Sequence, residues 1–236
     1  MAEPIVFLPG MMCDARLFGP QLAELSATHP VMCAPVHLGE RVEEIASVLL
    51  DQLPARFALA GLSMGGIVAM EILRRAPERI TRIALMDTNP LPETPQVAAG
   101  REPQIIGARA GRLMDVMREE MKPNYLAPGP QRVDVLSLVM DMADALGPDA
   151  FVCQSRALQR RRDQQKTLRG CKVPALVLCG EYDALCPVKR HVFMAELIPY
   201  AELQVISGAG HLPTLEQPEA TTAALRSWLA QPLVLQ

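Results

Sequence analysis

The chain has 236 residues, of which 50% are hydrophobic and 21% charged, a composition that fits one globular domain with an insertion and argues against disorder. Its formal net charge of −3 lacks the basic character of a nucleic-acid-binding protein. No apolar run reaches the roughly 20 residues of a membrane helix, and the start of the chain lacks the basic region of a signal peptide. The six cysteines show neither C-x-x-C nor metal-ligand spacing. We therefore expect reduced thiols, a cytoplasmic protein and no metal site.

Strand and helix patterns alternate along the first part of the chain. Short apolar or β-branched runs predict strands at 4–8, 31–34, 57–60 and 82–86. Amphipathic runs predict helices at 18–25, 42–53 and 67–75. Such alternation predicts an α/β fold of parallel strands joined by right-handed crossovers.

The alternation stops for about eighty residues after Asp87. This segment predicts helices at 105–120, 133–146 and 149–165, separated by prolines. The strand pattern then resumes at 173–180 and 203–206, and 218–229 predicts a closing helix.

The stretch Gly61-Leu62-Ser63-Met64-Gly65 lies between a predicted strand and a predicted helix. A G-x-S-x-G sequence in that setting is typical of a nucleophile elbow, where a tight turn exposes the serine hydroxyl and leaves no room for nearby side chains. The sequence therefore predicts Ser63 as a nucleophile. The alternative is a glycine-rich helix start without chemistry.

A nucleophilic serine needs a base and an acid, and both follow in the chain. Asp183 comes just after the strand at 173–180, and His211 follows the strand at 203–206. Parallel sheets build their sites at the carboxyl ends of strands, so we expect Ser63, Asp183 and His211 to meet there. Asp87, after the strand at 82–86, is a second candidate for the acid.

With these residues the chain resembles the α/β-hydrolase superfamily over nearly its whole length. The resemblance rests on four motifs: Leu8-Pro9-Gly10-Met11, the Ser63 elbow, Gly180-x-x-Asp183-x-x-x-Pro187, and Gly210-His211 with Glu216-Gln217-Pro218. It implies that the backbone N–H groups of Met11 and Met64 form an oxyanion hole, and that neither a metal nor an organic cofactor is needed. The family commonly has His-Gly where this chain has Pro9-Gly10.

The resemblance also implies a single domain over 1–236, with a core formed by 1–87 and 171–236 and a helical cap inserted at 88–170. The antiparallel hairpin that often opens this fold is missing, so we expect a smaller sheet. The implied activity is a serine hydrolase that cleaves an ester, thioester or lactone of a small to medium apolar substrate through an acyl-enzyme. The alternatives are a carbon–carbon bond hydrolase with the same triad and a triad-bearing small-molecule receptor. The oligomeric state is not predicted.

Several further residues have two interpretations each. The cap methionines either line a pliable pocket or pack between helices: Met114, Met117, Met121, Met140 and Met142. A run of arginines either binds a substrate carboxylate or forms a solvated face: Arg156, Arg160, Arg161 and Arg162. Cys186 lies either at the edge of the site or in the core. We expect three histidines at the surface: His29, His37 and His191.

Overall fold

The computed structural model describes residues 2–121 and 125–233, apart from the side chains at 120 and 121. Its centre is a six-stranded sheet whose strands are all parallel, in the order β2-β1-β3-β4-β5-β6. The strands are β1 (Ile5–Leu8), β2 (Val31–Cys33), β3 (Phe57–Leu62), β4 (Ile80–Met86), β5 (Ala175–Gly180) and β6 (Ala201–Ile206). The predicted α/β fold is confirmed, and the described residues contain no antiparallel strand pair in this sheet.

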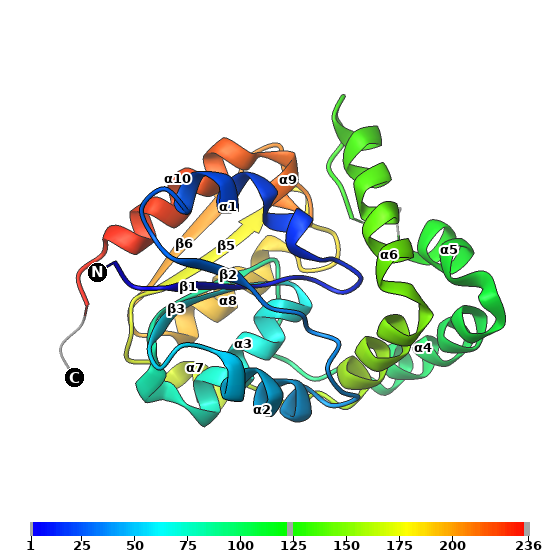
Figure 1. Cartoon of the computed structure of the whole chain (residues 1–236), viewed down its shortest axis with the longest axis horizontal. Helices are drawn as coiled ribbons and strands as arrows, with labels where there is room; N and C mark the ends of the chain where they lie inside the picture. Colours follow the sequence, from blue (N-terminus) through cyan, green and yellow to red (C-terminus); the bar gives the residue numbers. More distant parts are fainter. Residues whose placement is uncertain (1, 122–124, 234–236) are drawn as a thin grey trace.

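Helices cover both faces of the sheet (Figure 1). One layer contains α2 (Val42–Gln52), α3 (Met64–Arg75), α7 (Gln165–Arg169) and α8 (Val188–Leu197). The other contains α1 (Gly19–Leu25), α9 (Pro213–Glu216) and α10 (Pro218–Ala230). Short 3₁₀ turns, η1 (Ala15–Phe18) and η2 (Pro77–Arg79), precede α1 and β4. Because β1, β3, β4 and β5 are covered on both faces, their residues are buried throughout, which explains their continuous apolar sequences.

The segment between β4 and β5 is helical, as predicted, but its helices have different bounds. It contains α4 (Pro95–Gly107), the π-helical turns η3 (Ala108–Arg112) and η4 (Met117–Met121) with α5 (Leu113–Val116) between them, and α6 (Arg132–Gln159). The predicted helix at 105–120 begins ten residues earlier because the Thr94 side chain accepts a hydrogen bond from the Val97 N–H and caps α4. Gly111 (φ 80°) interrupts the helical conformation downstream.

The helices predicted at 133–146 and 149–165 correspond to the two parts of α6 on either side of a kink at Gly147, although the second part ends at Gln159. Gly147 has the non-helical angles φ 76° and ψ 177°, which suit glycine, and Pro148 lacks an N–H, so the helical conformation is interrupted there. In Figure 1, α4, α5 and α6 gather beyond one end of the sheet, at the end toward which β1 runs. The carboxyl ends of the parallel strands therefore face this helical segment.

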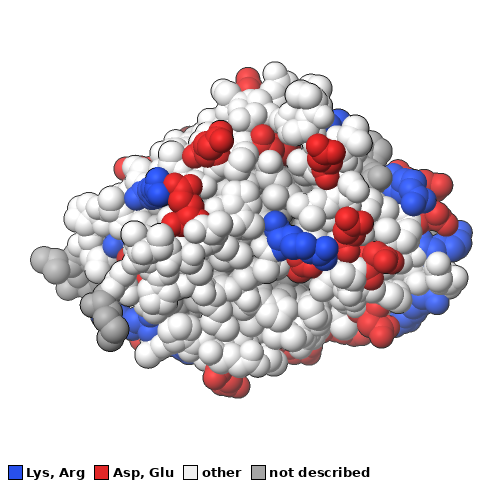
Figure 2. Space-filling model, turned by 45° about the horizontal axis from the view of Figure 1, so that its top comes forward, with Lys and Arg blue, Asp and Glu red and all other residues white. Residues whose placement is uncertain are grey.

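The surface in Figure 2 carries acidic and basic side chains side by side, with wide uncharged areas between them and no continuous basic area on the face shown. In the described part of the chain, no helix combines the length and apolar character needed to cross a membrane.

Candidate active site

Ser63 lies in a sharp turn between β3 and α3, with φ 54° and ψ −115°. This conformation is strained for a residue with a side chain and is sustained by tight packing around it. A Cβ at Gly65 would lie 1.9 Å from the Leu8 carbonyl oxygen, and one at Gly61 would lie 2.4 Å from the Gly65 oxygen. Only glycine fits at these two positions, so the G-x-S-x-G spacing is a steric requirement of this turn.

The structure brings Ser63, His211 and Asp183 into one hydrogen-bonded chain. His211 Nε2 lies 2.9 Å from Ser63 Oγ, and His211 Nδ1 lies 2.9 Å from Asp183 Oδ2. The other carboxylate oxygen of Asp183 accepts hydrogen bonds from the N–H groups of Leu185 and Cys186. Burial acts to raise the pKa of Asp183, but His211 and these donors outweigh it and hold the pKa below its usual value. Asp183 is therefore ionised and orients the imidazole ring.

Asp87 lies beside this chain but does not contact His211. It is fully buried at the end of β4, with φ 45°, and its Oδ1 accepts a hydrogen bond from the Gly180 N–H at 2.9 Å. Burial, followed by repulsion from Asp183, raises the pKa of Asp87 well above its usual value. Of the two candidate acids, Asp183 is the one that the structure places against the histidine.

Met64 directly follows Ser63, Met11 lies in the loop after β1, and both residues line the same cavity as Ser63. Neither N–H donates a hydrogen bond to another described residue. Met64 is the first residue of α3, where N–H groups lack partners within the helix. These two donors are free to bind an oxygen atom beside Ser63.

Two residues that we did not select from the sequence as functional support this arrangement. The carboxylate of Glu216 accepts hydrogen bonds from three backbone N–H groups, those of Ala127, Gly210 and Leu212, and so fixes the loop on either side of His211. The Gln154 side chain, buried on α6, accepts a hydrogen bond from the Met12 N–H at 2.9 Å. Met12 has φ 54°, so Gln154 holds a strained turn next to Met11. Glu216 lies in the His211 motif, whereas no sequence pattern marked Gln154.

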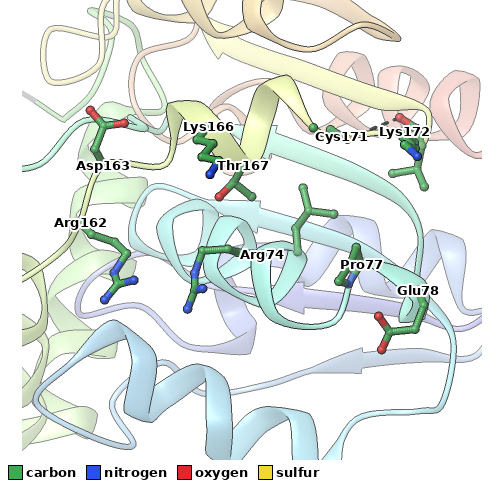
Figure 3. Close-up of a pocket in the computed structure, with 12 residues that line it drawn as sticks. Arg74, Pro77, Glu78, Arg162, Asp163, Lys166, Thr167, Cys171 and Lys172 are labelled. Carbon is green, nitrogen blue, oxygen red and sulfur yellow. Dashed lines mark hydrogen bonds between the residues drawn. The ribbon is translucent and has the colours of Figure 1, made fainter.

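Ser63 and His211 open into a cavity of about 420 Å³. Eight of its nineteen described lining residues have aliphatic, proline or methionine side chains: Met11, Met64, Ile67, Leu91, Pro92, Val97, Leu158 and Leu185. Arg101, Arg161, Arg190 and Glu93 add charged groups. A larger cavity of about 630 Å³ lies elsewhere, between the end of α3, η2 and α7 (Figure 3). Its described lining residues include neither serine nor histidine, so the smaller cavity is the candidate active site.

The other sequence candidates fall in different places. The methionines at 114, 117, 140 and 142 do not line the cavity, and three of them are buried among the helices, which supports the packing interpretation; the side chain of Met121 lies outside the described residues. Of the arginine run, Arg161 lines the cavity. The other three form ion pairs elsewhere: Arg156 with Glu102, Arg160 with Glu40 and Arg162 with Glu43.

Cys186 lies at the edge of the candidate site and lines its cavity. The residue is partly buried, and this desolvation raises the pKa of its thiol well above the usual value and keeps it protonated. One atom each of Asp183, Cys186 and His211 lie within 4.8 Å of one another. The two ring nitrogens of His211 lie within hydrogen-bond distance of Asp183 and Ser63, and these three residues form the hydrogen-bonded chain. The protonated thiol of Cys186 lies beside this chain.

The expectation of three surface histidines was wrong for His191. This residue is fully buried on α8, where its Nε2 accepts a hydrogen bond from the Thr88 N–H at 3.1 Å. Burial lowers its pKa to about 4. The same Thr88 donates its hydroxyl to the Ser63 carbonyl at 2.7 Å. His191 thus supports the Ser63 turn from behind, while His29 and His37 are partly exposed.

Comparisons with known proteins agree with this architecture. The chain is 27% identical over 197 residues to the pimeloyl-[acyl-carrier protein] methyl ester esterase of Photobacterium profundum, covering 80% of this chain and 77% of that protein. It is 26% identical over 204 residues to the biotin biosynthesis bifunctional protein BioHC of Teredinibacter turnerae, covering 80% of this chain but 36% of that longer protein.

Among solved structures, a thermophilic esterase from Thermogutta terrifontis with malate bound superimposes with a TM-score of 0.88 at 28% identity, over 97% of this chain and 90% of that one. The sequence model of the alpha/beta hydrolase family matches residues 5–225. Since that match spans nearly the whole chain, the protein belongs to the alpha/beta hydrolase family.

Proposed function

We propose that the protein is a serine hydrolase that cleaves an ester, thioester or lactone of a small to medium substrate through an acyl-enzyme. The observation that carries the proposal is the continuous chain from Ser63 Oγ through the His211 ring to Asp183, with both links at 2.9 Å. A serine hydroxyl is a weak nucleophile until a neighbouring base accepts its proton, and this geometry supplies that base. The esterase relatives support the same reaction type.

Each group then has one role in the reaction. Ser63 Oγ attacks the carbonyl carbon while its proton passes to His211 Nε2. The Nδ1–H of His211 donates to Asp183, whose negative charge stabilises the imidazolium that forms. The free N–H groups of Met11 and Met64 stabilise the negative charge on the carbonyl oxygen.

Collapse of the tetrahedral intermediate breaks the bond to the leaving group, which takes the proton from His211. Water then attacks the acyl-enzyme, with His211 as the base again, and releases the acid and free Ser63. The residues of the site supply every proton transfer in this sequence, so the proposed reaction uses neither a metal nor an organic cofactor.

We also propose that 88–170 acts as a cap on a core of 1–87 and 171–236. This segment supplies much of the wall opposite Ser63, including Val97 on α4 and Leu158 on α6. A lining of this kind selects substrates by size and shape. The free cysteines among the described residues are consistent with a reducing compartment such as the cytoplasm.

The direct test is a steady-state assay of purified protein on a panel of aryl esters, thioesters and lactones of graded chain length. We expect multiple turnovers on at least one member, with activity abolished in Ser63→Ala. Stoichiometric modification without turnover would instead favour a receptor. Turnover confined to a dienone-type carbon–carbon substrate would favour a carbon–carbon hydrolase.

A further inference from the structure

The candidate active-site cavity contains more positive than negative charge. Three guanidinium groups line it: Arg101 from α4, Arg161 from the turn after α6, and Arg190 from α8. Among the described lining residues, Glu93 is the single carboxylate. Asp183 lies behind His211, where its two oxygens are already occupied by hydrogen bonds, and does not line the cavity.

Arg101 is the nearer ion-pair partner of Glu93. Its Nε lies 3.0 and 2.9 Å from the two carboxylate oxygens of Glu93, and its Nη2 lies 2.6 Å from one of them. The Glu93 side chain is 2% exposed and that of Arg101 15%. This two-pronged geometry is the strong form of an arginine–carboxylate pair. Among the described lining residues, this one carboxylate therefore faces three guanidinium groups.

Arg161 and Arg190 are therefore poorly neutralised. Arg161 donates from Nε to the Leu91 carbonyl, and its Nη1 reaches Glu93 at 3.5 Å, at the limit of a hydrogen bond. The side chain of Arg190 makes neither a hydrogen bond nor an ion pair with any other described residue. The Arg161 side chain is 11% exposed, so water compensates its charge only in part.

The electrostatic environment of Arg161 is unfavourable for a cation. Burial lowers the pKa of Arg161; attraction to Glu93 opposes this effect, and smaller repulsions from Arg101 and Arg190 add to it. An anion placed in the cavity would relieve this repulsion and complete the hydrogen bonds of the guanidinium groups.

We propose that this cavity binds a carboxylate group of the substrate through Arg161 and Arg190. The substrate is then an ester that carries a free carboxylate, such as a monoester of a dicarboxylic acid. Its apolar chain lies along Met11, Ile67 and Leu158, and the ester carbonyl reaches Ser63. This inference rests on the proposed ester hydrolysis and assigns its substrate class.

The test compares monomethyl esters of succinate, glutarate and adipate with the matching methyl esters in which an amide replaces the free carboxylate. Each pair has the same length and shape, so the ratio of kcat/KM within a pair reports the charge alone. We expect wild type to favour the charged member by about ten-fold or more at its preferred length, the scale of one charge-assisted hydrogen bond.

Arg161→Gln should reduce this ratio about ten-fold, largely through KM. Arg190→Gln should reduce it in the same direction, and because that side chain has no described partner, its removal costs no internal hydrogen bond. Arg162→Gln is the matched control: it neighbours Arg161 but pairs with Glu43 away from the cavity, so the ratio should stay within two-fold of wild type.

Two outcomes separate this inference from the proposed function. Equal kcat/KM for charged and neutral esters, or a ratio that survives in both Arg161→Gln and Arg190→Gln, would overturn the carboxylate subsite while leaving ester hydrolysis intact. A protein that turns over no ester in either series or in the general panel would overturn the proposed function itself.

Discussion

Asp87 and Asp183 lie near each other at the carboxyl ends of β4 and β5, and their pKa values shift in opposite directions. Repulsion between two buried carboxylates favours a proton on one of them. Both oxygens of Asp183 already accept hydrogen bonds from N–H donors, whereas Asp87 Oδ2 receives none from any described donor. The proton therefore belongs to Asp87, whose pKa is raised, while the lowered pKa of Asp183 keeps that residue ionised against His211.

This relationship predicts opposite effects of the same substitution at the two positions. Asp183→Asn removes the charge that stabilises the His211 imidazolium, and we expect kcat to fall by roughly 10³- to 10⁴-fold. Asp87→Asn keeps an acceptor for the Gly180 N–H and is uncharged like the protonated Asp87 carboxyl, so kcat should stay within a few-fold of wild type. Steady-state kinetics on one ester, with thermal melts to verify folding, checks both values. The reverse ranking would assign the acid to Asp87.

The same proton makes stability depend on pH. The pKa of Asp87 is raised in the folded protein, so above about pH 4 the unfolded chain loses this proton while the folded protein keeps it, and the free energy of unfolding falls as pH rises. The side chain in the Asp87→Asn variant does not titrate, so its stability lacks this dependence on pH. Its Tm relative to wild type should therefore increase with pH above 4, by roughly 3 °C per pH unit in that window.

Melting curves of wild type and Asp87→Asn between pH 4 and 8 measure this difference. The lowered pKa of Asp183 acts in the opposite direction, but it is present in both proteins and cancels from the comparison. A Tm difference that stays constant or shrinks as pH rises would show that Asp87 is ionised in the folded protein.

Gln154 should control the position of the oxyanion turn. Replacing it with leucine keeps the volume but removes the acceptor for the Met12 N–H, so the strained turn can relax and displace the neighbouring Met11 N–H. We expect kcat to fall by about ten-fold, with a smaller change in KM, because the lost interaction acts on the transition state. Ser155→Ala is the control, since that neighbouring hydroxyl is buried without a hydrogen-bond partner in the described chain. Equal kcat in the two variants would remove this role from Gln154.

The methionines of the helical segment should affect stability more than specificity. Met117 and Met142 are 1% and 0% exposed and do not line the cavity, so Met117→Ala and Met142→Ala should each lower the free energy of unfolding by about 2–5 kcal/mol. The preferred ester chain length should not change. Denaturant titration and a chain-length series measure these two quantities. A shifted length preference with an unchanged melting temperature would favour the pocket interpretation instead.

The sequence predicted the sheet and the positions of Ser63, Asp183 and His211 because these depend on local patterns. A buried parallel strand is continuously apolar, and the elbow requires glycine where the Leu8 carbonyl approaches Gly65. These constraints act over a few residues, so a single sequence reveals them.

The sequence did not reveal groups whose roles depend on distant contacts. Gln154 acts across 142 residues on Met12, and His191 is buried because α8 packs against the loop at Thr88. Within the arginine run, helical spacing alone could not separate Arg161, which faces the cavity, from Arg162, which faces Glu43. Such assignments require the tertiary fold.

The central claim is that His211 activates Ser63 as the nucleophile, and covalent labelling tests it most directly. Purified protein is treated with a fluorophosphonate, and the adduct is counted by intact mass and located by peptide mapping. We expect one adduct per chain, on Ser63, with labelling lost in a folded Ser63→Ala variant and strongly slowed in His211→Gln. Labelling that persists undiminished in Ser63→Ala would contradict it.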